Sequence, residues 1–341
     1  MGRVKRSYIG QQRKPRQKFN GHTDLVQGVI HLPGGKRMIT CSGDGSLRVW
    51  NSEDGSQIGN AWHDGESPMN TMALSPNGKT VASGSDDGAV RLWDIGKGTM
   101  IAKWMGHSDR VLSVCWNRNG ERVVSGSVDG TARVWDVKNG ETILGPVNTR
   151  HDTVHAVVYS PDDTMVATGG SGSDGYIKIW DAKKFKLVTT LKGHEWTVRC
   201  LAWTADGMTL ISGSSDCTIR TWTTTTWKEL KVLKHDDEDD DCPIVAITTS
   251  PNHRILASAT LGFTAELWNI ENNERIGSPL QHGTDAVHCV SFSEDGSLLA
   301  TCSENNAYTW DVSAIVKEAG FDDLLLPSDV STDTFPSTSS Y

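Results

Sequence analysis

Tryptophan recurs along the chain at intervals of 42 to 46 residues, and this repeat constrains the fold more than any other feature. A histidine precedes each repeated tryptophan by 28 to 33 residues. A period of this length is typical of architectures in which each repeat is one supersecondary unit. We therefore expect seven copies of one unit. The seven tryptophans are Trp50, Trp93, Trp135, Trp180, Trp222, Trp268 and Trp310.

Each unit has the alternating pattern and the turn residues of a small antiparallel sheet. In the third unit, residues 111–117, 122–127 and 131–136 form three short strand-like runs. The turns between them contain Asn119-Gly120 and Asp129-Gly130, and such pairs favour tight hairpins because these turns need positive φ. In the second unit a fourth run follows at Thr99–Met105. Each unit is therefore predicted to be a four-stranded antiparallel meander.

A Gly-His pair, an Asp-Gly hairpin and a Trp-Asp pair recur in this order. The third unit shows them as Gly106-His107, Asp129-Gly130 and Trp135-Asp136. This pattern resembles the WD-repeat family, and the more regular units are also similar to the repeat arrays of fungal proteins. The resemblance covers roughly residues 15–311. It implies an all-β, seven-bladed β-propeller with four-stranded antiparallel blades.

The phase of the repeat predicts how the ring closes. The last unit ends at Asp311 after only three strands, and Arg16–Phe19 lies where a fourth strand belongs. We expect this N-terminal strand to complete the seventh blade, because closure removes an exposed sheet edge. The predicted organisation is a basic flexible arm at 1–14, one propeller domain at 15–311, and a short helix with an acidic Ser/Thr-rich tail at 312–341.

The resemblance also implies a buried relay of four side chains within each blade. The Trp indole would donate to a Ser or Thr hydroxyl, this hydroxyl would contact the His, and the His would contact an Asp. Each such bond contributes about 1 kcal/mol, whereas an unsatisfied partner costs about 1–3 kcal/mol. Five units carry the full set, namely His22, Thr40, Asp44, Trp50; His63, Ser83, Asp87, Trp93; His107, Ser125, Asp129, Trp135; His151, Thr168, Asp174, Trp180; and His194, Ser212, Asp216, Trp222.

The sixth and seventh units depart from the relay pattern. The sixth has His235, Ser258 and Trp268, but Gly262 stands where the Asp belongs. The seventh has His282, Thr301 and Trp310, with Asn305 as the stand-in for the Asp. We therefore expect these two blades to be looser than the others.

Two motifs resemble catalytic or cofactor sites. His107, Ser125 and Asp129 have the residue types of a catalytic triad, but near-copies in every unit make a structural role the better interpretation. The run 170–175 matches GxGxxG, yet a strand rather than a helix follows it, so we interpret it as an enlarged hairpin. No Cys/His set has zinc spacing. The sequence predicts no catalytic residue, no metal and no cofactor.

Composition limits the location and the partners. The seven cysteines are dispersed without a pairing pattern, which favours a reducing compartment, cytoplasmic or nuclear. The longest apolar runs are far shorter than the ~20 residues that a membrane span needs. Residues 1–19 carry seven Lys or Arg and no acid, although the net charge of the chain is −9. An acidic body disfavours nucleic acid, so nucleic-acid contact is expected only through the basic arm.

Two charged segments leave alternatives open. The six acids Asp236–Asp241 are a solvated insertion, a docking site for a basic partner, or a calcium loop, although the ligand spacing of an EF-hand is missing. The basic arm is a nuclear localisation or nucleic-acid segment, or a solubilising tail that leads into the closing strand.

Partner contacts are expected at one mouth of the central channel. In family members that read peptides, the residue after the first apolar residue of each innermost strand is a frequent contact. A second is the residue before the relay Asp. For any single position an ordinary surface role is equally compatible with the sequence. The partner-binding candidates, with rim neighbours included, are Gln27, Asn70, Asp86, Arg110, His155, Trp196, Arg199 and His288.

The predicted function is a non-catalytic protein-protein interaction scaffold that presents a propeller face to partner peptides. The first alternative is a reader of modified or basic peptides, as in a chromatin or ubiquitin-pathway subunit. The mouth offers Arg199 with Arg110 beside it, which is few arginines for a phosphopeptide reader. The second alternative, a propeller enzyme, would require convergent His or carboxylate side chains beyond the relays, and the sequence does not supply them.

Overall fold

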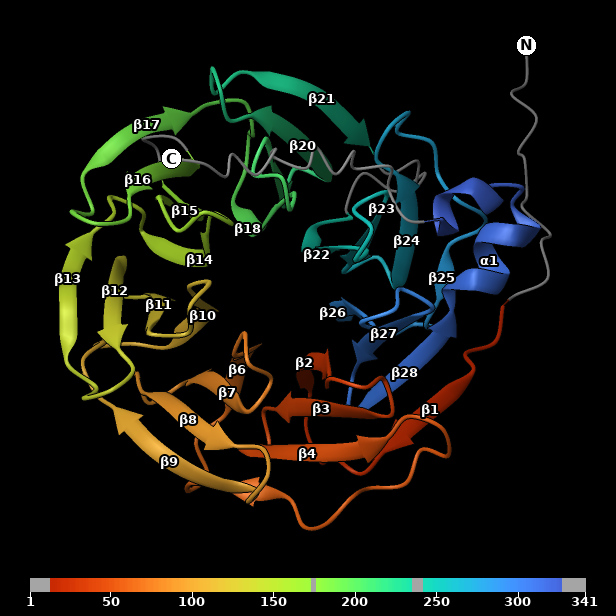
Figure 1. Ribbon diagram of the computed structural model, residues 1–341, viewed down its shortest axis with the longest axis horizontal. Helices are drawn as coiled ribbons and strands as arrows, with labels where there is room; N and C mark the ends of the chain where they lie inside the picture. The colour runs from red at the N-terminus through yellow and green to blue at the C-terminus, as the bar shows by residue number, and fades with distance from the viewer. Residues whose placement is uncertain (1–12, 173–175, 235–241, 327–341) are drawn as a thin grey trace, which may run out of the picture.

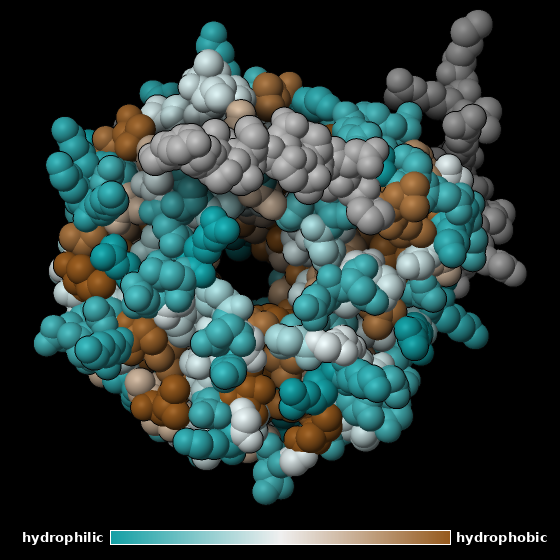
Figure 2. Space-filling model, viewed as in Figure 1, coloured by the Kyte–Doolittle hydropathy of each residue, from teal (hydrophilic) through white to brown (hydrophobic). Residues whose placement is uncertain are grey.

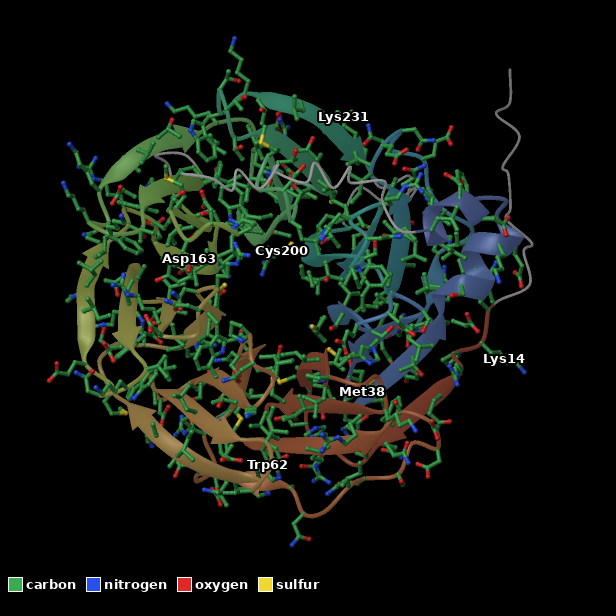
Figure 3. All side chains as sticks on the ribbon, viewed as in Figure 1. Lys14, Met38, Trp62, Asp163, Cys200 and Lys231 are labelled. Atoms are coloured by element: carbon green, nitrogen blue, oxygen red, sulfur yellow. The ribbon has the colours of Figure 1, made fainter. Side chains whose placement is uncertain are left out.

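The computed structural model describes residues 13–172, 176–234 and 242–326. They form seven four-stranded antiparallel sheets arranged as a ring around a central channel (Figure 1). The protein is a seven-bladed β-propeller, as the repeat predicted. The strands of a blade are called a to d from the channel outward. Lys231 marks an outermost strand and Cys200 an innermost one in Figure 3.

Blades 1 to 4 follow one another along the chain. Their strands are β2 (Val26–His31), β3 (Arg37–Ser42), β4 (Ser46–Asn51) and β5 (Trp62–His63) in blade 1; β6 (Met69–Leu74), β7 (Thr80–Ser85), β8 (Val90–Asp94) and β9 (Thr99–Trp104) in blade 2; β10 (Val111–Trp116), β11 (Arg122–Ser127), β12 (Thr131–Asp136) and β13 (Thr142–Asn148) in blade 3; and β14 (Thr153–Tyr159), β15 (Met165–Ser171), β16 (Ile177–Asp181) and β17 (Leu187–Leu191) in blade 4.

Blades 5 to 7 complete the ring, and a short helical segment follows. Their elements are β18 (Val198–Trp203), β19 (Thr209–Ser214), β20 (Thr218–Thr223) and β21 (Glu229–Lys234) in blade 5; β22 (Ile244–Thr249), β23 (Ile255–Thr260), β24 (Thr264–Asn269) and β25 (Leu280–Gln281) in blade 6; β26 (Val287–Phe292), β27 (Leu298–Ser303), β28 (Asn306–Asp311) and β1 (Gln17–Asn20) in blade 7; then helix α1 (Val312–Glu318) and the 3-10 turn η1 (Asp322–Leu325).

The N-terminal strand closes the ring. β1 pairs antiparallel with β28, and Phe19 lies opposite Ala307. Phe19 is buried in a cluster that joins Val26 and Trp50 of blade 1 to Cys302 of blade 7. The first strand of the chain therefore stabilises the contact between the first and last blades, as predicted.

The core is divided among the contacts between neighbouring blades. One cluster joins Val124 and Val134 of blade 3 to Val154, Val157 and Val166 of blade 4. β-branched side chains suit such half-buried pleated surfaces. Because each sheet buries residues against both neighbours, the ring forms one continuous packed unit.

The tight hairpins place glycines where backbone segments meet. Gly120 and Gly130 have φ of 72° and 75°. A Cβ on Gly130 would lie 2.7 Å from the carbonyl oxygen of His151, at the entry to the next blade. The b–c turn of one blade thus rests on the d–a loop of the next. The GxGxxG run ends strand β15, which pairs antiparallel with β16, so its interpretation as part of a hairpin is confirmed.

Every blade has a bulge at the same place in its innermost strand. Near the start of strand a, one residue has no partner opposite it in strand b. In blade 5, for example, Val198 lies opposite Ser214 and Cys200 lies opposite Gly213, so the residue between them is skipped. Bulges re-aim a side chain out of the regular ladder. The skipped residues are Gln27, Asn70, Leu112, His155, Arg199, Val245 and His288.

Candidate functional site

Blade 3 contains the four-residue relay in full. The Trp135 indole N–H donates to Ser125 Oγ at 2.8 Å, and Ser125 Oγ lies 2.7 Å from His107 Nε2. His107 Nδ1 lies 2.9 Å from Asp129 Oδ2. This geometry corresponds to a neutral imidazole that carries its proton on Nδ1 and accepts from the serine hydroxyl. The relay joins strands b and c to the loop that enters the blade.

Blades 1 and 5 repeat this geometry. His22 Nδ1 lies 2.8 Å from Asp44 Oδ2, and His194 Nδ1 lies 2.8 Å from Asp216 Oδ2. The hydroxyl two residues after each Asp also donates to the carboxylate, as Thr131 Oγ1 does to Asp129 at 2.7 Å. Sequence reasoning missed this fifth member. Its signal is the Ser or Thr two residues after the relay Asp, at Ser46, Thr131 and Thr218.

Blade 2 corrects the prediction for His63. Trp93 still donates to Ser83 at 2.9 Å, but His63 is exposed at the end of β5. His63 and Asp87 are 24 residues apart, whereas His107 and Asp129 are 22 apart. The two extra residues lengthen the loop, which leaves the histidine on the surface.

The Arg91 guanidinium binds the blade 2 carboxylate instead of a histidine. Arg91 is 1% exposed, and its Nη2 lies 2.6 Å from Asp87 Oδ2. Its Nε donates to Asp64 Oδ2 at 2.9 Å, and Lys103 Nζ lies 3.2 Å from both carboxylates. Blade 2 is thus held by a four-charge cluster. Strand c carries an arginine at the position equivalent to Arg91 in blades 1, 3 and 5 as well. The sequence therefore offers no clear signal that Arg91 takes the place of His63 in blade 2.

Blades 4 and 6 keep the tryptophan bond of the relay. Trp180 donates to Thr168, which lies 3.1 Å from His151 Nε2, and Trp268 donates to Ser258 at 3.0 Å. Asp174 and His235 lie outside the described residues. In blade 4, Lys178 Nζ donates to the carbonyl of Thr149 at 2.8 Å.

Blade 7 replaces the carboxylate with a backbone group. His282 Nε2 lies 2.8 Å from Thr301 Oγ1, while its Nδ1 lies 3.1 Å from the carbonyl of Leu280. Asn305 instead accepts from Asn306 at 2.8 Å, so the prediction that Asn305 stands in for the Asp is wrong. Thr301 and Trp310 are 9 residues apart, whereas Ser125 and Trp135 are 10 apart, so this hairpin is one residue shorter and places its side chains differently.

Burial lowers the pKa of the relay histidines of blades 1, 3, 4 and 7 and so favours their neutral form. Burial lowers the pKa of His107 despite the nearby Asp129, and it lowers the pKa of His282 to about 4. Burial alone would raise the pKa of Asp129, but hydrogen bonds from Thr131 and the interaction with His107 hold it below its usual value. A neutral imidazole thus donates to an ionised carboxylate, which is a stabilising arrangement rather than a nucleophile activated for attack.

The bulged residues lie at the narrow mouth of the channel, where the d–a loops and b–c turns meet. Asn70 donates to Asp86 at 2.8 Å, and Arg199 Nε donates to Ser215 Oγ at 2.7 Å. Burial lowers the pKa of His155 to about 4, and the nearby Arg199 cation adds to the shift. Blades 4 and 5 therefore bring His155 and Arg199 close together.

Other predicted contacts lie apart from this pair. The Trp196 side chain is 60% exposed on the d–a loop that leads into blade 5. Arg110 is exposed on the d–a loop that leads into blade 3. Burial lowers the pKa of His288, and the Glu304 carboxylate of the same blade opposes the shift. Gln27 is half-buried at its bulge in blade 1. The mouth therefore combines the neighbouring pair His155 and Arg199 with side chains that lie apart from this pair.

Figure 2 shows the channel open at the centre of the ring, viewed from the face that carries helix α1, opposite this mouth. Carboxylates are exposed on the d–a loops of five successive blades. Within the described ranges, no group of three or more His, Cys, Asp or Glu side chains could hold a metal ion. The acidic run Asp236–Asp241 lies outside those ranges. The exposed carboxylates are Asp24, Glu66, Asp109, Asp152 and Glu195.

The closed ring of seven four-stranded antiparallel sheets defines the class of protein, a β-propeller. Six segments of the chain match the family model described as WD40: WD domain, G-beta repeat. These segments make up more than half of the chain, so the chain belongs to this family, whose members are generally protein-interaction scaffolds. The matched residues are 13–51, 60–94, 98–136, 145–181, 185–223 and 274–311.

Several curated proteins are similar to about half of the chain. Periodic tryptophan protein 2 of Arabidopsis thaliana is 30% identical over 47% of this chain and 17% of its own length. Nuclear distribution protein PAC1 of Arthroderma otae is 30% identical over 49% of this chain and 37% of its own length. Transcription factor unc-37 of Caenorhabditis elegans is 28% identical over 48% and 27%. The chain thus matches less than two-fifths of the length of each of these relatives.

Proposed function

We propose that the protein is a non-catalytic scaffold whose narrow face binds peptide segments of other proteins. The observation that supports the proposal is the bulge near the start of all seven innermost strands, because a bulge takes one side chain per blade out of the regular ladder close to the channel mouth. Next to this ring, Trp196 is 60% exposed. Trp and Arg most often carry interface energy, so Trp196 and Arg199 are the proposed anchors.

A peptide-array screen of the purified protein tests this proposal. We expect retention of a defined set of peptides, with loss of binding in Trp196→Ala and Arg199→Ala. Ile101→Ala is the matched control, because Ile101 is 53% exposed but lies on the outer strand β9. Equal binding by all three variants, or turnover of generic ester or phosphate substrates by the protein, would contradict the proposal.

A second candidate function is a reader of basic peptides. It is supported by the exposed carboxylates on successive d–a loops, among them Asp109, Asp152 and Glu195. Lys/Arg-rich segments would be attracted to such a face, and the attraction would weaken with salt. Selective retention of Lys/Arg-rich peptides at low salt, reduced in Asp152→Asn, favours this candidate over a general scaffold.

The proposed location is the cytoplasm or the nucleus. All seven cysteines are free thiols, which supports a reducing compartment. Among the described residues, no helix has the length and apolar character that crossing a membrane demands. Fractionation of cells that express the tagged chain tests the location directly.

A further inference from the structure

A groove lies on the wide face of the propeller, opposite the proposed peptide-binding mouth. Strands β14 and β18 end beside it at Tyr159 and Trp203, and the a–b turns that follow form its walls. It has one part of about 470 Å3 and another of about 440 Å3, which share Arg118, Pro161 and Ala205. Cavities of this volume accommodate a small molecule or a short peptide segment.

Two buried polar groups in this groove lack hydrogen-bond partners within the described part of the chain. They are Tyr159 Oη, on a side chain that is 8% exposed, and Trp203 Nε1. In the neighbouring blade, Trp116 Nε1 donates to the carbonyl of Ala73 at 3.0 Å. A buried unsatisfied group costs about 1–3 kcal/mol. Both groups can donate, so a ligand that supplies carbonyl acceptors would satisfy them.

The remaining surface of the groove is largely aromatic and apolar. The rings of Trp203 and Trp227 meet edge to face with centroids 6.1 Å apart. Pro161 lines the opposite wall, and Met208 is 50% exposed beside them. Aromatic grooves with donor groups suit extended segments that contain proline, because such segments leave their carbonyls free.

Residues 312–326 run along the wide face from blade 7 to blade 6, which is the blade next to blade 5. Helix α1 follows β28 and packs Ile315 and Val316 into the core cluster that contains Leu280 of β25 (Figure 1). Leu324 is buried, and Asn252 Nδ2 donates to the carbonyls of Leu324 and Leu326 at 2.7 and 3.1 Å. Asn252 belongs to the a–b turn of blade 6, so the chain has crossed from blade 7 to blade 6 at Leu326.

The next blade along this path carries the groove. The a–b turns of blades 5 and 6 are neighbours. Burial lowers the pKa of His253 in the blade 6 turn, and the Asp206 carboxylate in the blade 5 turn is close enough to oppose this shift. Phe335-Pro336 begins nine residues after Leu326. Nine extended residues span about 30 Å, whereas packed sheets lie ~10 Å apart. The remaining chain is therefore long enough to reach the groove.

We propose that residues 327–341 dock in the wide-face groove of this chain, with Phe335 and Pro336 packed against Trp203 and Trp227. Carbonyl groups of the tail accept hydrogen bonds from Trp203 Nε1 and Tyr159 Oη. The tail then covers the apolar walls and leaves the narrow face open. This proposal is independent of the function assigned to the narrow face.

Photo-crosslinking in the full chain tests the docking. Phe335 is replaced by p-benzoylphenylalanine, whose excited ketone reacts with nearby C–H bonds, and the products are mapped by mass spectrometry. We expect an intramolecular cross-link to residues 203–208, the segment that includes Met208. Cross-links spread over several blades, or products that join two chains, would overturn the proposal.

A second cross-linking experiment compares a variant that blocks the groove with a matched control variant. Ala205→Arg places a long side chain in the groove, and Pro76→Arg makes the same change at the equivalent exposed position of the blade 2 turn. We expect the cross-link yield to fall several-fold in Ala205→Arg and to stay unchanged in Pro76→Arg, with circular dichroism verifying the fold of both. Equal yields in the two variants would refute docking in this groove.

Discussion

Blades 2 and 3 perform the same structural task with different chemistry. In blade 3 a neutral His107 donates to Asp129, and the relay continues through Ser125 to Trp135. In blade 2 the charged Arg91 binds Asp87 and Asp64 directly. The difference shows that a buried donor other than histidine can bind the carboxylate of a blade. Either donor joins strand c to the entry loop.

Removing the charged donor of blade 2 is expected to have the largest effect. Arg91→Ala leaves Lys103 to balance the charges of Asp87 and Asp64, and removing one partner of a buried ion pair costs about 3 kcal/mol or more. Urea denaturation measures the loss in free energy of unfolding. The matched control is Arg133→Ala in blade 3, whose guanidinium lies over the Trp135 ring instead. Similar losses in both variants would show that the cluster has no special role.

Removing the relay carboxylate of blade 3 is expected to cost somewhat less. Asp129→Ala leaves His107 Nδ1 and the Thr131 hydroxyl without their acceptor, at about 2 kcal/mol by the same denaturation assay. Combined with His107→Ala, it should show a coupling of about 1 kcal/mol. Strict additivity of the two substitutions would contradict the relay.

Acid is expected to separate the histidine blades from blade 2. Burial lowers the pKa of His151 and of His282 to about 4, from an ordinary value of 6.5. An unfolded chain takes up protons near pH 6.5 that these buried rings accept only near pH 4. Each of these histidines should therefore lower the stability by roughly 3 kcal/mol as the pH drops through the whole window, and by roughly 2 kcal/mol between pH 7 and pH 5.

Blade 2 should respond to acid only below this window. A hydrogen bond from Arg91, the main cause, keeps the pKa of Asp87 well below its usual value, so its ion pairs persist until the carboxylate is protonated. Hydrogen exchange at pH 7 and pH 5, corrected for intrinsic rates, compares the blades. A uniform loss of protection around the ring would argue against the contrast.

The smallest effect is expected at His63, the histidine that the relay does not use. His63→Ala should change the free energy of unfolding by less than about 0.5 kcal/mol, because exposed side chains contribute little. His107→Ala is the comparison and should cost about 2 kcal/mol. A comparable cost at His63 would mean that it enters a relay after all.

Sequence reasoning reached furthest where the pattern repeats. The number of blades, their strands and the pairing of the N-terminal strand with blade 7 all follow from spacing and turn residues. The bulged positions were predicted as contacts through the family resemblance, before their pairing was known. The exchange of Arg91 for His63 was missed, because loop length changes where a side chain lies without changing its type.

The sequence by itself determined the architecture, because a local period in hydrophobicity and turn residues is repeated until the ring can close. Only the tertiary structure decided which donor reaches each carboxylate, which mouth residues meet, and that Tyr159 and Trp203 share one groove. The mouth and the groove join residues of neighbouring blades that lie some 40 positions apart, whereas the donor is chosen among residues at most 27 positions from the carboxylate. Their distances are set by loop geometry and packing, which no local pattern encodes.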